Sequence, residues 1–257
     1  MMAVVLTFLA VSCEKDPHYS RGNYIYEGVL SPPPIPDAVR DYDGNSYNAV
    51  WIGNQLWMKE NLRTRHYADG TAIPAGGSST STTSPCYYDY SASGIPLEKR
   101  GYLYNWPAAM HGAASSTTNP SHVQGICPDG WHLPSDAEWT QLENYVSSRS
   151  EYTCGGNSSN IAKALASGTG WNTSANSCAV GNNQGTNNAT GFSAVPAGYC
   201  GGSSFYDADN VAFFWSATQR ASKPDNAYGR SLYYHEAYVS SRNVSKNAGR
   251  SVRCLRD

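Results

Sequence analysis

Histidine is the first residue type to consider for catalysis, because its side chain exchanges a proton near neutral pH. Of the six histidines, we consider His132 first, because two carboxylates, Asp136 and Glu138, follow it closely in sequence. Both carboxylates fall in the first turn of a predicted helix, where Asp136 suits the helix dipole and Glu138 completes a capping box. We therefore interpret His132 as structural, and we predict no catalytic residue.

Cysteine can serve as a nucleophile, a metal ligand or half of a disulfide. The chain has seven cysteines, without a Cys-x-x-Cys motif or a pair of histidines spaced to complete a zinc site. Cys13 ends a short apolar segment, and the remaining even set favours disulfides in an exported chain. That set is Cys86, Cys127, Cys154, Cys178, Cys200 and Cys254. Many pairings are open, although a Cys154–Cys178 bridge would staple a loop that has little core of its own.

Two short segments carry oxygen atoms of the kind that calcium binds. Residues 207–210 are an isolated acidic cluster, and residues 223–226 have Lys where an acceptor oxygen is needed. We interpret both as turns. The glycine-rich segments 155–158 and 201–204 lack the Gly-Lys-Ser/Thr ending of a phosphate loop. Neither a metal nor a cofactor is expected.

The segment from residue 225 to residue 254 is dense in Tyr, Arg, Ser and His. This composition is typical of binding surfaces, where rigid rings supply contact area and small polar residues adapt, although an exposed sheet edge shares it. Alternate residues of a strand share a face, so Leu232 and Tyr234 are expected inside and Tyr233 and His235 outside. The predicted ligand-binding face comprises Tyr199, Tyr206, Tyr228, Ser231, Tyr233, His235, Tyr238 and Arg242.

The N-terminus indicates the compartment. Residues 1–13 form an apolar run of signal-peptide length, and the residues around Cys13 resemble a bacterial lipobox. We expect a lipidated Cys13, membrane contact through the lipid anchor only, and a surface-exposed position at the outer membrane. Residues 14–37 then form a Pro-rich tether and residues 38–257 one domain. A net charge of -2 argues against nucleic acid as a partner.

Local patterns predict the elements that position these residues. Ser135 and Glu138 predict the start of a helix, and Trp139, Leu142 and Val146 give that helix one apolar side. A second short helix is predicted over residues 160–167, and a hairpin over residues 41–62 turns at residues 53–54. With 19 Tyr and 24 Gly in the chain, these patterns favour a mixed α+β fold.

Ordered sequence blocks resemble the Fibrobacter succinogenes major paralogous domain. The blocks include DGNSY and IGNQLWMKENL (43–62), GYLYNW (101–106), GICP through Trp139 (125–139), GFSAVPAGY (191–199), FWSAT (214–218) and SVRC (251–254). The resemblance implies a C-type-lectin-like fold with two helices, short twisted antiparallel sheets and long disulfide-stapled loops. It also implies kinship with the formylglycine-generating enzyme domain and a place on the bacterial surface.

The resemblance also bears on the cysteines. In that fold the strand that enters the first helix lies beside the last strand, which implies a Cys127–Cys254 bridge. Cys154–Cys178 is the second expected bridge, and Cys86 and Cys200 remain as the third pair.

The C-terminal segment resembles the variable region of ligand-binding proteins that retroelements diversify. An Arg-x-Leu-x-Tyr frame (230–234) alternates with residues that altered Asn codons can encode. Those residues are Tyr228, Gly229, Ser231, Tyr233, His235, Ser240, Ser241 and Asn243. We expect a surface lipoprotein that binds a glycan or protein ligand without catalysis. The alternatives are a formylglycine-generating-like oxidase and a structural envelope or fimbria-associated subunit.

Overall fold

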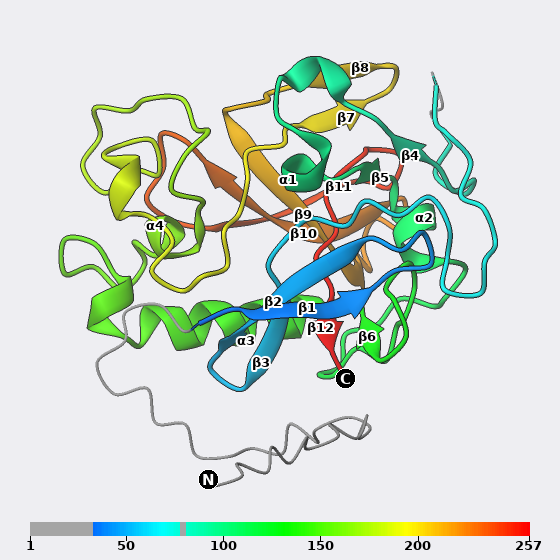
Figure 1. Cartoon of the computed structure of the whole chain (residues 1–257), viewed down its shortest axis with the longest axis horizontal. Coiled ribbons are helices and arrows are strands. Elements are labelled where there is room, and N and C mark those ends of the chain that lie inside the picture. The colour runs from blue at the N-terminus through cyan, green and yellow to red at the C-terminus, as the bar shows by residue number, and fades with distance from the viewer. Residues whose placement is uncertain (1–32, 78–80) are drawn as a thin grey trace, which may run out of the picture.

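The computed structural model describes residues 33–77 and 81–257. The predicted signal peptide, Cys13 and most of the predicted tether lie outside these residues. The described part combines short antiparallel sheets with short helices, which confirms the α+β class. Figure 1 shows the sheets grouped around one longer helix, α3, that runs across the molecule.

The largest sheet has five strands in the order β1-β2-β3-β12-β6, and every neighbouring pair is antiparallel. Its strands are β1 (Ile35–Arg40), β2 (Ser46–Ile52), β3 (Gln55–Met58), β12 (Leu255–Arg256) and β6 (Trp131–His132). Strands β2 and β3 are the predicted hairpin, and its turn contains Gly53 in the left-handed region at φ 63. Strand β1 begins at Ile35, so the last residues that we assigned to the tether belong to this sheet.

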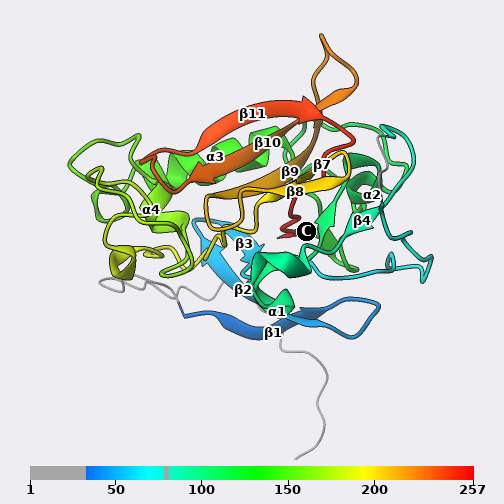
Figure 2. The same ribbon diagram turned by 90° about the horizontal axis from the view of Figure 1, so that it is seen from above.

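A second sheet has the order β11-β10-β9 and is also antiparallel. Its strands are β9 (Val211–Gln219), β10 (Asn226–Tyr233) and β11 (Ser240–Ser245). Two antiparallel two-stranded pairs complete the strands: β4 (Tyr87–Tyr88) with β5 (Leu103–Tyr104), and the hairpin of β7 (Tyr199–Gly201) with β8 (Ser204–Tyr206). Figure 2 shows the β9–β11 sheet on the opposite side of the molecule from β1 and β2, with β7–β8 beside β9.

Helix α3 (Asp136–Ser147) begins where the sequence predicts. The Ser135 hydroxyl accepts the backbone N–H of Glu138, and the Glu138 carboxylate accepts the backbone N–H of Ser135, which completes the capping box. Trp139 packs between the two sheets, with ring centroids 4.7 Å from Trp57 on β3 and 5.6 Å from Phe214 on β9. The helix therefore joins the two sheets through its apolar side.

The remaining helices are short. They are α1 (Leu97–Arg100), α2 (Trp106–Met110), α4 (Ala162–Leu165) and the 3₁₀ turns η1 (Ser91–Ser93), η2 (Ser150–Tyr152) and η3 (Gln184–Thr186). Helix α4 is the second predicted helix but is shorter than expected, because the chain becomes extended at Ala166 and forms a bridge with Ala194. In residues 33–77 and 81–257 no helix is long and apolar enough to cross a bilayer.

Two of the three predicted disulfides are confirmed. Cys127 is bonded to Cys254, which ties the segment before β6 to the segment before β12, and Cys154 is bonded to Cys178. The third prediction, Cys86–Cys200, is wrong for this structure. The two thiols share one small core cluster, but Cys86 Sγ donates to the Tyr88 hydroxyl at 3.1 Å and Cys200 Sγ approaches the Gly202 carbonyl oxygen at 3.8 Å.

Candidate aromatic binding face

Strand β10 is mostly buried, and the predicted alternation is seen at its C-terminal end. Leu232 is 2% exposed and belongs to the core cluster around α3, and Tyr234 packs against the same cluster. Tyr233 is half-buried and His235 is exposed. The inward position of Leu232 and the outward position of His235 are therefore confirmed.

Rings from three segments meet in one continuous network. Tyr199 and Tyr206 stack at 5.3 Å, and Tyr199 meets the edge of Phe213 at 5.4 Å. Phe213 then contacts Tyr233 at 5.8 Å, and Tyr233 lies 5.8 Å from His235. The Arg242 guanidinium lies 5.5 Å from the centre of the Tyr233 ring. We define the aromatic face as Tyr199, Tyr206, Phe213, Tyr233, His235 and Arg242.

Strand pairing explains why these residues meet. Tyr199 and Tyr206 are direct partners in the β7–β8 hairpin, whose turn contains Gly202 at φ 65. Phe213 on β9 is opposite Ser231 on β10, next to the position of Tyr233 on the same side of the sheet. A bridge between Gly198 and Ala212 holds the hairpin against β9. The face thus requires residues that lie far apart in the sequence.

Three predicted residues lie elsewhere. Ser231 is fully buried, because it lies on the middle strand with Phe213 and Ser240 as its neighbours. Tyr228 shares its side of the strand with Arg230, which contacts α3, because the five-residue spacing from Tyr233 places the two tyrosines on opposite sides. Tyr238 is 43% exposed in the β10–β11 turn, and no described ring contact joins it to the aromatic face.

Sequence reasoning missed two residues, Phe213 and Arg250. Phe213 sits in the apolar run of β9, and a strand that is buried on both sides gives no alternation signal from which its direction could be read. The Arg250 guanidinium lies over the rings of Phe213 at 4.1 Å and Trp215 at 5.1 Å. Its Nε and Nη1 atoms are buried without a hydrogen-bond partner among the described residues. Burial lowers the pKa of Arg250 to about 9, with Tyr233 and Tyr199 opposing this effect and the nearby charge of Arg242 adding to it.

The Tyr199 hydroxyl of the face responds to its burial and its neighbours. Burial raises the pKa of the Tyr199 hydroxyl above its ordinary value, and the negative charge of Asp207 raises it further. Tyr199 is therefore a neutral hydrogen-bonding group at physiological pH rather than a base. The face can stack on a planar or apolar group and exchange hydrogen bonds with it.

His132 is buried between two carboxylates. Its Nε2 lies 2.8 Å from the Glu138 carboxylate and its Nδ1 lies 2.6 Å from Asp257, whereas Asp136 turns away to Arg230. Burial lowers the pKa of His132, but the two carboxylates outweigh this effect and hold it above its ordinary value. Glu138 thus serves the helix cap and the imidazole together.

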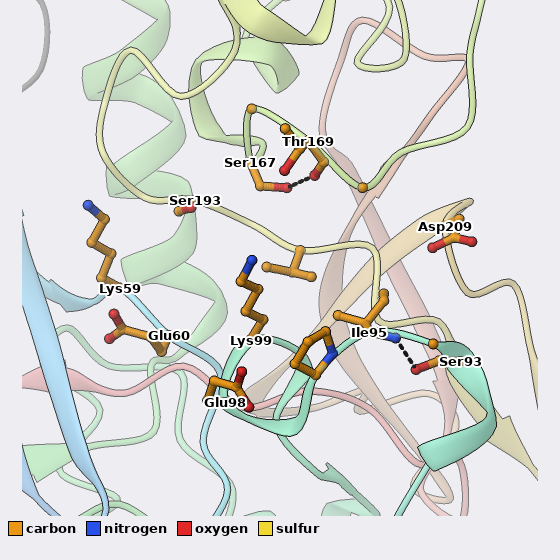
Figure 3. Close-up of a pocket in the computed structure, with 15 residues that line it drawn as sticks. Lys59, Glu60, Ser93, Ile95, Glu98, Lys99, Ser167, Thr169, Ser193 and Asp209 are labelled. Carbon is orange, nitrogen blue, oxygen red and sulfur yellow. Dashed lines mark hydrogen bonds between the residues drawn. The ribbon is translucent and has the colours of Figure 1, made fainter.

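Apart from the aromatic face, the molecule has a pocket of about 600 Å³ that shares no lining residue with that face. Figure 3 shows Lys59 and Lys99 on one side of it and the Ser167–Thr169 loop across from them. Two of its polar side chains already form hydrogen bonds within the protein. The Glu60 carboxylate accepts from Asn48, and the Ser167 hydroxyl donates to the Thr169 carbonyl oxygen. The pocket therefore offers a weaker candidate site than the aromatic face.

The segments considered for calcium form turns. The backbone N–H of Asn210 donates to the Asp207 carbonyl oxygen, and that of Asn226 donates to the Lys223 carbonyl oxygen. Within the described ranges, 33–77 and 81–257, no group of three His, Cys, Asp or Glu side chains is placed to hold a metal ion.

Comparison with known proteins identifies the domain. The family model described as the Fibrobacter succinogenes major domain matches residues 50–256. No curated protein and no solved structure matches the chain. The match includes the aromatic face and both cysteines of the Cys127–Cys254 bridge.

Proposed function

The chain belongs to the Fibrobacter succinogenes major domain family, and we propose that it is a cell-surface lipoprotein that binds a glycan or protein ligand through the aromatic face. In this proposal Cys13 carries the lipid anchor at the outer membrane, and the domain performs no catalysis. The accessible, connected rings of the aromatic face are the observation on which the proposal rests.

The properties of the face support binding. Tyr206 is 45% exposed and His235 is also exposed, while Tyr199 and Tyr233 are held by their ring neighbours. Rigid aromatic side chains lose little conformational entropy on binding and bury a large area, which is why they dominate the energetics of many interfaces. A pre-arranged set of rings favours recognition of a sugar ring or an exposed side chain.

The cysteines favour binding over the oxidase alternative. Four of them are occupied in disulfides, and Cys200 is buried. Burial, together with a smaller effect of the neighbouring Cys86, raises the pKa of the Cys200 thiol to about 11. Cysteine chemistry requires an accessible thiolate, so this thiol is poorly suited to a catalytic role.

Diversification of the C-terminal segment is the finer part of the proposal, and burial restricts the positions that it can include. A side chain at Gly229 would place its Cβ 2.1 Å from the Phe214 carbonyl oxygen, and Ser231 is fully buried. We therefore exclude positions 229 and 231 and retain the others as variable positions: Tyr228, Tyr233, His235, Ser240, Ser241 and Asn243. Sequencing the locus in several isolates tests this part, since changes should concentrate at the retained positions.

A screen of glycan and surface-protein arrays tests the binding proposal. The wild-type chain is compared with Tyr233→Ala, His235→Ala and a matched control, Tyr42→Ala, which removes a tyrosine that is 61% exposed outside the aromatic face. The two face variants should lose the hits that the wild type and the control retain. Hits that survive both face substitutions would refute the assigned surface, and purification in a stoichiometric assembly would favour the structural-subunit alternative.

The lipid anchor is tested separately. The full chain and a Cys13→Ser variant are expressed with a radiolabelled fatty acid and partitioned into detergent. Label and detergent partitioning should both disappear in the variant. Equal partitioning of the two chains would remove the anchor from the proposal and leave the binding face unaffected.

A further inference from the structure

Arg250 differs from the other buried arginines. Arg100 pairs with Asp89, and Arg230 pairs with Asp136 and Glu143. The Arg253 guanidinium donates to the Asn61 side chain and to the backbone carbonyl oxygens of residues 58, 192 and 193. Arg250 is 3% exposed, yet it forms no ion pair with any described residue, and two of its nitrogens have no acceptor.

The aromatic contacts of Arg250 leave part of its bonding capacity unused. Phe213 and Trp215 lie against the guanidinium, and their rings stabilise its positive charge through cation–π attraction. The N–H bonds of a guanidinium lie in its plane and require acceptor oxygens along the edge. An acceptor in that plane would supply what the two rings do not.

A second guanidinium lies on the same side of the sheet. Gly229 on β10 is the direct partner of Arg242 on β11 and of Trp215 on β9. A Cβ at residue 229 would lie 3.6 Å from Arg250 Nη1, which places the Arg250 guanidinium above Gly229 on this side of the sheet. Arg242 is exposed and, like Arg250, forms no ion pair among the described residues.

We propose that Arg242 and Arg250 together bind the carboxylate or sulfate group of an acidic ligand. This inference rests on the proposed binding function and specifies the ligand class. Arg242 is the outer contact at the aromatic face, and Arg250 is the inner contact above Gly229. A guanidinium binds such groups through paired N–H bonds, and an anion between the two arginines also relieves their mutual repulsion.

Binding to defined polysaccharides tests the inference. The full chain is titrated with dextran sulfate, with polygalacturonate as the carboxylate probe and unsubstituted dextran as the neutral probe. The variants are Arg242→Gln and Arg250→Met, with Arg256→Gln as a control that removes an exposed arginine from β12. We expect one of the anionic probes to bind, unsubstituted dextran not to bind, and Kd to rise about tenfold or more in each face variant but not in the control.

A direct measurement covers the case in which Arg250→Met does not fold. The Arg250 Nε–H resonance, assigned by its loss in Arg250→Lys, should shift when the probe binds to the wild type, and the same shift in Arg242→Gln should need about tenfold more probe. An unshifted Arg250 resonance, or equal loss of binding in Arg256→Gln, would overturn the inference.

The outcomes also separate this inference from the proposed function. Array hits that depend on Tyr233 but are neutral, and that are indifferent to Arg242→Gln, would refute the anionic ligand and leave the binding face standing. Hits that ignore Tyr233 and His235 would refute the face itself.

Discussion

Adjacent residues of β10 should separate stability from binding. Leu232 is 2% exposed in the cluster around α3, while Tyr233 is half-buried on the aromatic face. Replacing Leu232 with Ala removes buried methyl groups from a packed core. Replacing Tyr233 with Ala removes a ring that packs on Phe213 at 5.8 Å and has His235 and the Arg242 guanidinium on its exposed side.

The two magnitudes differ enough to measure. A buried Leu→Ala change costs about 2–5 kcal/mol, because the transfer free energy is lost and a cavity remains. In a domain of this size each kcal/mol lowers Tm by about 2–4 °C, so Leu232→Ala should lower it by roughly 4–20 °C. An aromatic pair contributes about 0.5–1.5 kcal/mol beyond its buried area, which sets the scale for Tyr233→Ala, and we expect a small loss. His235→Ala should cost less than about 0.5 kcal/mol, because its side chain is exposed.

Calorimetry under oxidising conditions measures stability, and ligand capture measures binding. Leu232→Ala should bind normally at a temperature where it remains folded, whereas Tyr233→Ala and His235→Ala should fold normally and bind poorly. Equal loss of Tm in Leu232→Ala and His235→Ala would contradict the assignment of the two sides of β10. So would a Leu232→Ala variant as stable as the wild type.

Three further outcomes are expected. Replacing both Cys127 and Cys254 with Ser should lower the free energy of unfolding by about 5 kcal/mol in the chain-entropy model, which peptide mapping and urea denaturation check together. Because the pKa of His132 is raised in the folded state, its stabilising contribution is complete below the unfolded pKa of about 6.5 and is lost as pH rises through the folded pKa. As pH rises through this range, the urea midpoint should therefore fall less steeply in His132→Asn than in the wild type. Parallel profiles of midpoint against pH would contradict this. The Cys200 thiol, whose pKa burial raises to about 11, should react with a disulfide reagent only slowly until the chain is unfolded in urea. Rapid reaction in the native state would support the oxidase alternative.

Features that depend on neighbours in sequence were predicted well. The capping box of α3 needs only Ser135 and Glu138, three residues apart, so it was visible before any tertiary contact was known. The β2–β3 hairpin and the inward position of Leu232 follow from a turn and from strand alternation. The position of Tyr228 was predicted wrongly, although the sequence was sufficient to place it. Its five-residue spacing from Tyr233 puts the two side chains on opposite sides of the strand.

The family frame determined one long-range contact, the Cys127–Cys254 bridge, because it fixes which strands are neighbours. It did not determine whether Cys86 and Cys200 form a disulfide, and in the structure they do not. Those thiols share a cluster but are directed toward other oxygen atoms, and side-chain direction depends on local packing.

Only the tertiary structure determined the composition of the aromatic face. The sequence identified Tyr199, Tyr206, Tyr233, His235 and Arg242 as candidates, but it could not place the β7–β8 hairpin beside β9. Phe213 and Arg250 become part of the arrangement through cross-strand register and through the space above Gly229. The physical reason is that helix caps, turns and strand alternation are set by residues a few positions apart, whereas register, burial on a middle strand and the supply of hydrogen-bond acceptors are set by segments that meet only in the folded chain.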